Sequence, residues 1–151
     1  MYMKNLPSTT LGGLYFGQIA EASYTVTNGM IDSFSAISGD YNSLHLDDAY
    51  ASRTMYRERI APGMLTANFI SAVLGTKLPG HGCVCLTLNL NFMTPVRIGD
   101  TVTGKVIVTA IDPILRQVVL KTEAFASAPR YGTEEVQVAG GEALVYMPTL
   151  A

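Results

Sequence analysis

The feature that most restricts the fold is one apolar stretch, residues 61–75 (APGMLTANFISAVLG). It has the length of a helix and is apolar almost all round, with small residues at positions 67, 71, 72 and 75. A helix with this pattern has to be covered on most sides rather than along a single stripe. Pro62 suits the start of such a helix, and Gly75 followed by Pro79 suits its end. The rest of the chain must therefore supply a layer that wraps this helix.

Most of the remaining chain is predicted to be β-strand. In residues 83–92 the even positions read Val, Leu, Leu, Leu, Phe and the odd positions Cys, Cys, Thr, Asn, Asn, which is the alternation of a strand with one face in a core. The fold class predicted is α+β, a curved antiparallel sheet of about five strands wrapped round one long buried helix. The other strands, bounded by turn-forming residues, are predicted at 20–34 (with a turn or bulge at Gly29), 101–111, 114–126 and 135–147.

Composition sets limits on the possible partners. At 151 residues the chain is predicted to be a single domain over residues 1–151. Only 15% of the residues are charged and 48% are hydrophobic, so a buried interface between subunits is expected. The net charge of −2 and the lack of a basic stripe argue against a nucleic-acid partner. No apolar run approaches the roughly 20 residues of a membrane-spanning helix.

The cysteines and the first residues bear on the compartment. Cys83 and Cys85 alternate on a predicted strand, which is poor geometry for a mutual disulfide, and they lack the second ligand pair of a zinc site. We expect two small buried side chains in a reducing cytoplasm. Residues 1–10 hold one Lys and no apolar core, so no secretory signal is expected there.

Two places carry residues suited to chemistry. Residues 34–45 (FSAISGDYNSLH), which we predict not to be regular helix, bring Asp40 close to His45, one of only two histidines. An Asp and a His together can move protons at neutral pH, but Asp40 and Asn42 are equally good turn formers, and the residues alone leave both interpretations open. At the predicted helix start after Pro62, the backbone N–H groups of the first turn lack partners within the helix and could bind an anion or an oxyanion.

Several motifs, in order, resemble those of the MaoC-like (R)-specific enoyl-CoA hydratases, a family with the hot-dog fold. The resemblance runs roughly from residue 31 to residue 147. Asp40, Asn42 and His45 match the family's hydratase motif of Asp-x-Asn-Pro-x-His type, with Ser43 in place of the proline. The other matching segments are IAPGML at 60–65, LPG at 78–80, FMTPVRIGD at 92–100 and GEALV at 141–145.

The resemblance implies an activity and roles for particular residues. Water would add reversibly to a trans-2-enoyl thioester of coenzyme A or acyl carrier protein, giving an (R)-3-hydroxyacyl thioester. Asp40 and His45 would be the catalytic pair that holds and activates this water, and the Gly63 N–H would stabilise the enolate. Asn42, Pro62 and Gly63 would be the substrate-binding residues, and Pro62 stands where many family members have His. No metal or bound cofactor is implied, and the family's sheets pair edge to edge, which implies a homodimer.

Three alternatives remain. A dehydratase that acts on a carrier-protein thioester would use the same chemistry in reverse. A hot-dog thioesterase would normally place a carboxylate on the central helix, and residues 64–75 contain no Asp or Glu. A non-catalytic acyl-thioester binding module would be indicated by loss of Asp40 or His45, and both are present. Five cations could meet the phosphates of a nucleotide thioester or could be ordinary surface charges: Arg53, Arg57, Arg59, Lys77 and Arg97.

Overall fold

The computed structural model describes residues 11–149. Residues 1–10, where no secretory signal is expected, and residues 150–151 lie outside the described part. The elements, in chain order, are the 3-10 turn η1 (Leu11–Gly13), β1 (Ile19–Thr25), α1 (Asn28–Ser38), α2 (Ser43–Leu46), α3 (Asp48–Ala51), α4 (Gly63–Thr76), β2 (Val84–Phe92), β3 (Thr101–Asp112), β4 (Gln117–Ser127), the 3-10 turn η2 (Pro129–Tyr131) and β5 (Val136–Tyr146).

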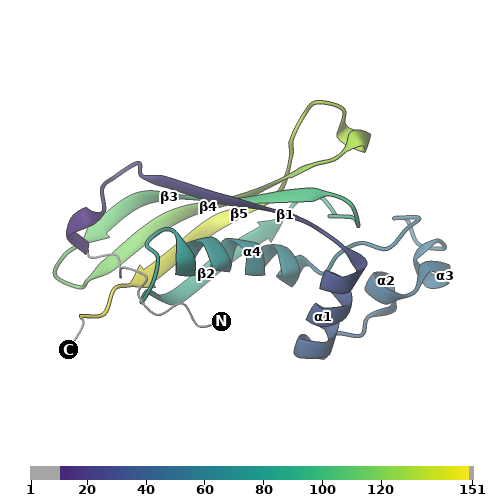
Figure 1. Ribbon diagram of the computed structural model, residues 1–151, viewed down its shortest axis with the longest axis horizontal. Coiled ribbons are helices and arrows are strands. Elements are labelled where there is room, and N and C mark those ends of the chain that lie inside the picture. The colour runs from purple at the N-terminus through teal and green to yellow at the C-terminus, as the bar shows by residue number, and fades with distance from the viewer. Residues whose placement is uncertain (1–10, 150–151) are drawn as a thin grey trace.

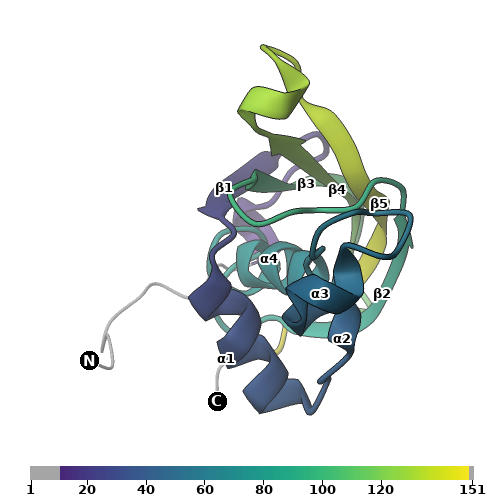
Figure 2. The ribbon, with the colours of Figure 1, turned by 90° about the vertical axis from the view of Figure 1, so that its right-hand side faces the viewer.

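The strands form one antiparallel sheet in the order β1-β3-β4-β5-β2. The central helix α4 lies along one face of this sheet, and α1, α2 and α3 gather beyond one end of α4 (Figure 1). A view along α4 shows the strands arching round the helix from β1 to β2 (Figure 2). The predicted hot-dog arrangement, a curved five-stranded antiparallel sheet round one long helix, is confirmed.

The packing of α4 is tight on the sheet side and open on the other. Ile70 of α4 is fully buried in the core. A Cβ atom at Gly104 on β3 would stand 3.4 Å from the Ile70 nitrogen, so the glycine lets the helix backbone come close to the strand. On the opposite face Met64, Asn68 and Ser71 are exposed in this chain, so α4 is covered on fewer sides than its sequence predicts.

The prediction of a strand over residues 20–34 is wrong in its second half, where α1 begins. Thr27 is the N-cap of this helix, and its Oγ1 accepts a hydrogen bond from the Met30 N–H at 3.2 Å. Ile31 is fully buried and anchors α1 in the core. Gly29 therefore lies inside a helix and not at a turn or bulge.

The prediction that residues 34–45 are not regular helix is correct only for their middle. Helix α1 continues to Ser38 and ends at Gly39, whose φ of 76° lies in the left-handed region. The Gly39 N–H donates to the Ser35 carbonyl at 2.9 Å, which closes the helix. The short helix α3 follows α2, and Asp47 is its N-cap.

The strand predicted from residue 114 begins only at Gln117, because residues 113–116 form a turn. The Asp112 Oδ1 atom accepts hydrogen bonds from the Ile114 and Leu115 N–H groups, at 2.9 and 2.8 Å. Arg116 adopts a φ of 56°, which completes the reversal. The predicted strands at 101–111 and 135–147 agree with β3 and β5 to within one residue at each end.

Strand β2 is less buried than its alternation predicts because it lies at the edge of the sheet. Leu88 and Leu90 are half-buried against the core, as expected for inward-facing positions. Val84, Leu86 and Phe92 are 46%, 47% and 51% exposed. The described chain therefore leaves an apolar sheet edge uncovered.

Among the helices of residues 11–149, none combines the length and the apolar character needed to cross a bilayer. The prediction of one domain over residues 1–151 stays a prediction.

Candidate active site

Hydrogen bonds between side chains and backbone N–H groups shape the segment that carries the candidate catalytic pair. The Asp40 N–H donates to Ser38 Oγ at 3.2 Å, and Asp40 Oδ1 accepts from the Asn42 N–H at 3.1 Å. Asn42 Oδ1 in turn accepts from the Leu44 N–H at 3.0 Å, which makes Asn42 the N-cap of α2. His45, which follows Leu44, therefore lies on a short helix whose start is fixed by the Asn42 cap. One oxygen of Asp40 is occupied by the loop, and the other is left for a partner.

The His45 ring is held by a backbone carbonyl. His45 is 8% exposed, and its Nδ1 lies 2.8 Å from the Ile60 carbonyl oxygen. A carbonyl can only accept a hydrogen bond, so Nδ1 carries the proton in this contact. In the neutral ring Nε2 is then an acceptor, and it faces Asp40 Oδ2 at 3.9 Å. This separation is too long for a direct hydrogen bond, but it leaves space for a water in contact with both atoms.

A cavity of about 330 Å³ opens beside His45. Its walls come from α2, the segment before α4, the first turns of α4, the end of β2 with the connection that follows, and β5. A small number of polar groups among apolar walls is typical of a small-molecule site. The lining residues are His45, Tyr56, Ile60, Ala61, Gly63, Thr66, Phe92, Met93, Thr94, Pro95, Val96 and Val138.

The start of α4 supplies a backbone donor to this cavity. Pro62 is the N-cap and has no N–H, so Gly63 provides the first N–H group of the helix. The first amides of a helix have no acceptor within the helix and carry the positive end of its dipole. A Cβ atom at Gly63 would lie 3.3 Å from Cδ1 and Cε1 of the Phe92 ring, so the glycine keeps the approach to its N–H clear.

The predicted site residues differ in their positions relative to the cavity. His45 and Gly63 both line it, and Asp40 reaches His45 from the adjoining loop. Asp40 itself is not among the lining residues, and neither are Asn42 and Pro62, which we predicted to bind substrate. Asn42 caps α2 and Pro62 sits at the start of α4, so each supports a residue that does reach the cavity.

Sequence reasoning missed other lining residues. Thr66 is 3% exposed and follows Gly63 by one helical turn, so helical spacing from Gly63 could have revealed it. Met93 lies within the matching segment at residues 92–100, but its apolar side chain gave no reason to assign it to the site. Tyr56 and Val138 had no sequence signal, because they reach the cavity from segments far apart in the chain.

Four of the five candidate phosphate-binding cations have partners elsewhere in the chain. Arg59 Nε lies 2.8 Å from Asp48 Oδ1, and Lys77 Nζ donates to the Glu21 carbonyl at 2.8 Å. The guanidinium of Arg97 pairs with Glu58. Arg53 is exposed, but its Nε donates to the Ala49 carbonyl at 3.1 Å, and Arg57 is exposed.

The two cysteines are free thiols. Cys83 is half-buried, whereas Cys85 is exposed, so the prediction that both are buried is wrong for Cys85. Burial raises the pKa of the Cys83 thiol, with a further contribution from Cys85, and partial desolvation raises the pKa of the Cys85 thiol. Within residues 11–149, no three His, Cys, Asp or Glu side chains are grouped as metal ligands would be.

The chain is similar to known proteins over most of its length. The family model described as the MaoC like domain matches residues 17–127, which include Asp40, His45 and Gly63. An (R)-specific enoyl-CoA hydratase of Rhodospirillum rubrum is 42% identical over 132 residues, 87% of this chain and 87% of the relative. A 3-hydroxybutyryl-CoA dehydratase of Methylorubrum extorquens is 44% identical over 123 residues, 82% of this chain and 74% of the relative. A solved structure, the (R)-hydratase from A. caviae involved in PHA biosynthesis, has a TM-score of 0.82 at 38% identity and covers 90% of this chain and 98% of its own.

Proposed function

Because the chain belongs to the MaoC-like family of (R)-specific enoyl-CoA hydratases, we propose that it is a hydro-lyase. In the proposed reaction it reversibly hydrates trans-2-enoyl thioesters of coenzyme A to (R)-3-hydroxyacyl thioesters. One observation carries the proposal. His45 lines a cavity together with Gly63, the first residue of α4, and its Nε2 lies 3.9 Å from Oδ2 of Asp40 in the adjoining loop. These are the groups that addition of water next to a thioester carbonyl requires.

The proposed chemistry uses one water between the pair. Both the Asp40 carboxylate and the neutral His45 Nε2 accept hydrogen bonds, so a single water can donate one proton to each and point an oxygen lone pair at the substrate. The water oxygen then bonds to the β-carbon as the double bond breaks. One water proton passes to the pair, and the pair delivers a proton to the α-carbon. No oxidation or reduction occurs overall, so the reaction needs no redox cofactor, and no metal is proposed.

The start of α4 would stabilise the charge that develops during this reaction. Negative charge moves onto the thioester oxygen as the enolate forms, and the Gly63 N–H is the proposed donor to it. A backbone donor at a helix start needs no reorganisation, and removing such a donor typically lowers the rate about 10²–10³-fold. Asn42 would hold the pair in place through α2, and Pro62 would hold the position of Gly63.

The direct test is to add the purified protein to crotonyl-CoA and longer enoyl-CoA thioesters and to follow the loss of enoyl-thioester absorbance. Chiral analysis should find the (R)-3-hydroxyacyl product. A carrier-protein thioester of the same acyl group separates a CoA enzyme from a carrier-protein dehydratase, because only the preferred carrier should be turned over efficiently. Folded protein without activity on any of these substrates would refute the proposal.

A thioesterase would instead release free coenzyme A from the same substrates, which a thiol reagent detects. The described helix α4, Gly63–Thr76, carries no Asp or Glu, so it offers no carboxylate for attack of water on the carbonyl. We therefore expect no thiol release.

The cytoplasmic location expected from the free cysteines belongs to the same proposal, and fractionation of the source cells would check it.

We also propose that the chain forms a homodimer through the open edge of β2. The exposed side chains of Val84 and Leu86 would be covered by a second copy, and the low charge content of the chain supports such an interface. Phe92 and Met93, which line the cavity, are 51% and 55% exposed near the same edge, so the partner would also restrict access to the cavity.

Sedimentation tests the dimer. Leu86→Lys places a charge at the β2 edge and should shift the protein toward monomer. Ile114→Lys is the matched control, because Ile114 is 90% exposed at the turn between β3 and β4 and should leave the dimer intact. A wild-type protein that sediments only as monomer would contradict the dimer proposal.

A further inference from the structure

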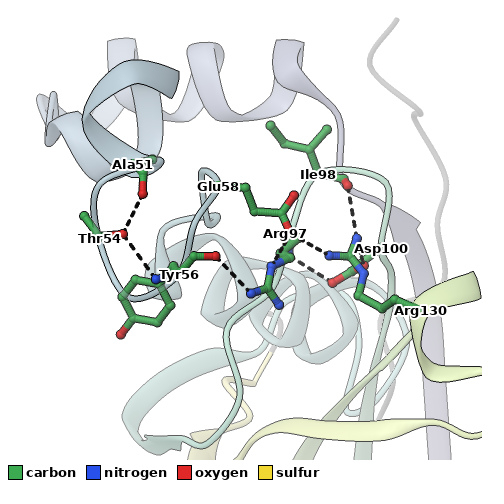
Figure 3. A network of polar contacts seen from close by, with 8 residues as sticks. All are labelled: Ala51, Thr54, Tyr56, Glu58, Arg97, Ile98, Asp100 and Arg130. Carbon is green, nitrogen blue, oxygen red and sulfur yellow. Dashed lines mark hydrogen bonds and ion pairs between the residues drawn. The ribbon is translucent and has the colours of Figure 1, made fainter.

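A buried carboxylate lies outside the proposed chemistry. Asp100, directly before β3, is fully buried. Its Oδ2 accepts a hydrogen bond from the Arg97 N–H at 2.9 Å, and its Oδ1 lies 2.7 Å from Nη2 of Arg130 in η2 (Figure 3). A buried carboxylate is costly unless it is paired and hydrogen-bonded, and Arg130 and the Arg97 N–H are the partners of Asp100.

Glu58 links the same two arginines from the segment before α4. Its Oε1 lies 2.5 Å from Arg97 Nε and 3.4 Å from Arg130 Nη1. Two acids and two bases thus form one cluster, which we call the charge network: Glu58, Arg97, Asp100 and Arg130. The network joins three segments that are distant in sequence, namely residues 56–60, the turn at residues 97–100, and η2 between β4 and β5.

The charge network is connected to the cavity through Arg97. Its Nη2 donates to the carbonyl of Tyr56, a cavity-lining residue, at 3.4 Å. Arg97 also forms an isolated antiparallel bridge with Ile60, and the adjacent Ala61 N–H donates to the Val96 carbonyl at 2.7 Å. Ile60 supplies the carbonyl that holds the Nδ1 proton of His45. One arginine therefore fixes both the cavity wall and the backbone that orients the histidine.

We propose that the charge network is a positioning assembly for His45. By fixing the Arg97 backbone, it holds the Ile60 carbonyl in place, which keeps the proton on Nδ1 and leaves Nε2 free to accept from water. Its four members are positioning residues, because none of them lines the cavity. This inference rests on the proposed function and adds to it the origin of the His45 tautomer.

Replacing Arg130 tests the proposal at a distance from the cavity. Arg130→Gln removes the charge partner of Asp100, so the turn at residues 97–100 should loosen and the hydrogen bond from His45 to Ile60 should weaken. Arg130→Lys keeps a cation near Asp100 and should retain most of the wild-type behaviour. Arg116→Gln is the matched control, since Arg116 also binds a carbonyl, that of Met147 at 2.6 Å, but at the other end of β3 and β4.

The first readout is the tautomer of His45 in ¹⁵N-histidine-labelled protein, which long-range ¹H–¹⁵N spectra report directly. The chain has only two histidines, so His81 serves as an internal reference. We expect the Nδ1–H form in the wild type, in Arg130→Lys and in Arg116→Gln, and a mixture of tautomers in Arg130→Gln. A purely structural network would lower the stability of Arg130→Gln but leave the tautomer of the folded protein unchanged.

The second readout is the kinetics of hydration. Arg130→Gln should lower kcat about tenfold and change KM less than about twofold, because the proposed defect is the orientation of a catalytic group, and misplacement of about 1 Å can reduce rates by up to about 10²-fold. The double variant Asp100→Asn/Arg130→Gln leaves no unpaired buried charge. It should recover both the Nδ1–H tautomer and most of kcat.

Two results would overturn the inference: wild-type tautomer and kcat in folded Arg130→Gln, or equal losses in Arg116→Gln. If Arg130→Gln does not fold, Arg97→Lys takes its place, because it keeps a charge for Glu58 but removes the donor to Tyr56. Wild-type tautomer and kcat in that variant would overturn the inference equally. The tautomer is measured without substrate, so a wild type without hydratase activity would refute the proposed function and still leave the positioning of His45 testable.

Discussion

Replacement of Asp40 by Asn and of His45 by Gln, singly and together, tests whether the two side chains act on one water. Asp40 Oδ2 and His45 Nε2 are 3.9 Å apart, whereas direct hydrogen bonds of this type span about 2.7–3.2 Å. One water at about 2.8 Å from each atom fits this separation. If that water is the nucleophile, loss of either residue removes most of its activation, and loss of the second residue should lower the rate little further.

This geometry sets the expected magnitudes. Loss of one proton-transfer group should lower kcat about 10²–10⁴-fold, which is about 3–5.5 kcal/mol of barrier at 1.36 kcal/mol per factor of ten. Two independent groups would give the product of their effects, about 10⁴–10⁸-fold. For a shared water, the double variant should lie within about tenfold of the slower single variant, because groups that act as a unit are strongly non-additive.

The assay is hydration of crotonyl-CoA at saturating substrate, with thermal unfolding of each variant as the control for folding. The Asp40 side chain is 41% exposed, so its loss should destabilise the fold by less than about 1 kcal/mol. Loss of the buried hydrogen bond from His45 to Ile60 should cost about 1 kcal/mol. His81→Gln, which changes the other histidine, should keep the wild-type rate to within about twofold.

Two outcomes would refute the reasoning. Losses that multiply in the double variant would show that the residues act in separate steps and not on one water. Near-full rates in both single variants would show that the assignment of the catalytic pair is wrong.

Two further predictions concern stability and thiol reactivity. A Cβ atom at Gly141 would overlap the Asn89 carbonyl oxygen, so Gly141→Ala should force β5 and β2 apart and destabilise the protein by about 1–3 kcal/mol or more in denaturant unfolding. The control Gly29→Ala lies in the open first turn of α1 and should be neutral or stabilising by up to about 1 kcal/mol. Equal effects of the two substitutions would contradict this prediction. Because the pKa values of Cys83 and Cys85 are raised, the folded protein should hold less thiolate than the unfolded chain at pH 8, and iodoacetamide should alkylate the folded protein more slowly. The stability that the protonated thiols contribute should be lost as the pH rises above about 9. Equal alkylation rates in the folded protein and the unfolded chain would exclude the shift.

Some of the fold and of the candidate site could be predicted from local sequence signals. The apolar stretch around Ile70 predicts the central helix because burial on several sides leaves no polar face, and Pro62 places its start correctly. Period-two alternation predicts the strand at residues 83–92 because side chains of a strand point alternately to the two faces of a sheet, and turn-forming residues bound the three strands that follow. The family motif predicts that Asp40 and His45 lie close together, and the structure places them 3.9 Å apart, Asp40 in the loop before α2 and His45 on α2.

The errors arose where a tertiary contact decided between local alternatives. Residues 26–34 contain β-formers and a glycine, yet Thr27 caps a helix and Ile31 anchors that helix in the core. The start of β4 moved because the Asp112 side chain binds the turn backbone. The exposure of Leu86 on β2 follows from the position of this strand at the sheet edge, which a single strand's pattern does not specify.

The sequence by itself determined the class of fold and the central helix, and it predicted the acid and the imidazole of the candidate site, because each has a signature in the side chains of one short segment. Only the tertiary structure decided how the histidine is oriented. Its acceptor is the Ile60 carbonyl, and every residue has such a carbonyl, so no residue type marks it. Likewise Asp100 and Arg130 become partners only when η2 folds back over the turn before β3, since their attraction depends on distance in space and not on separation along the chain.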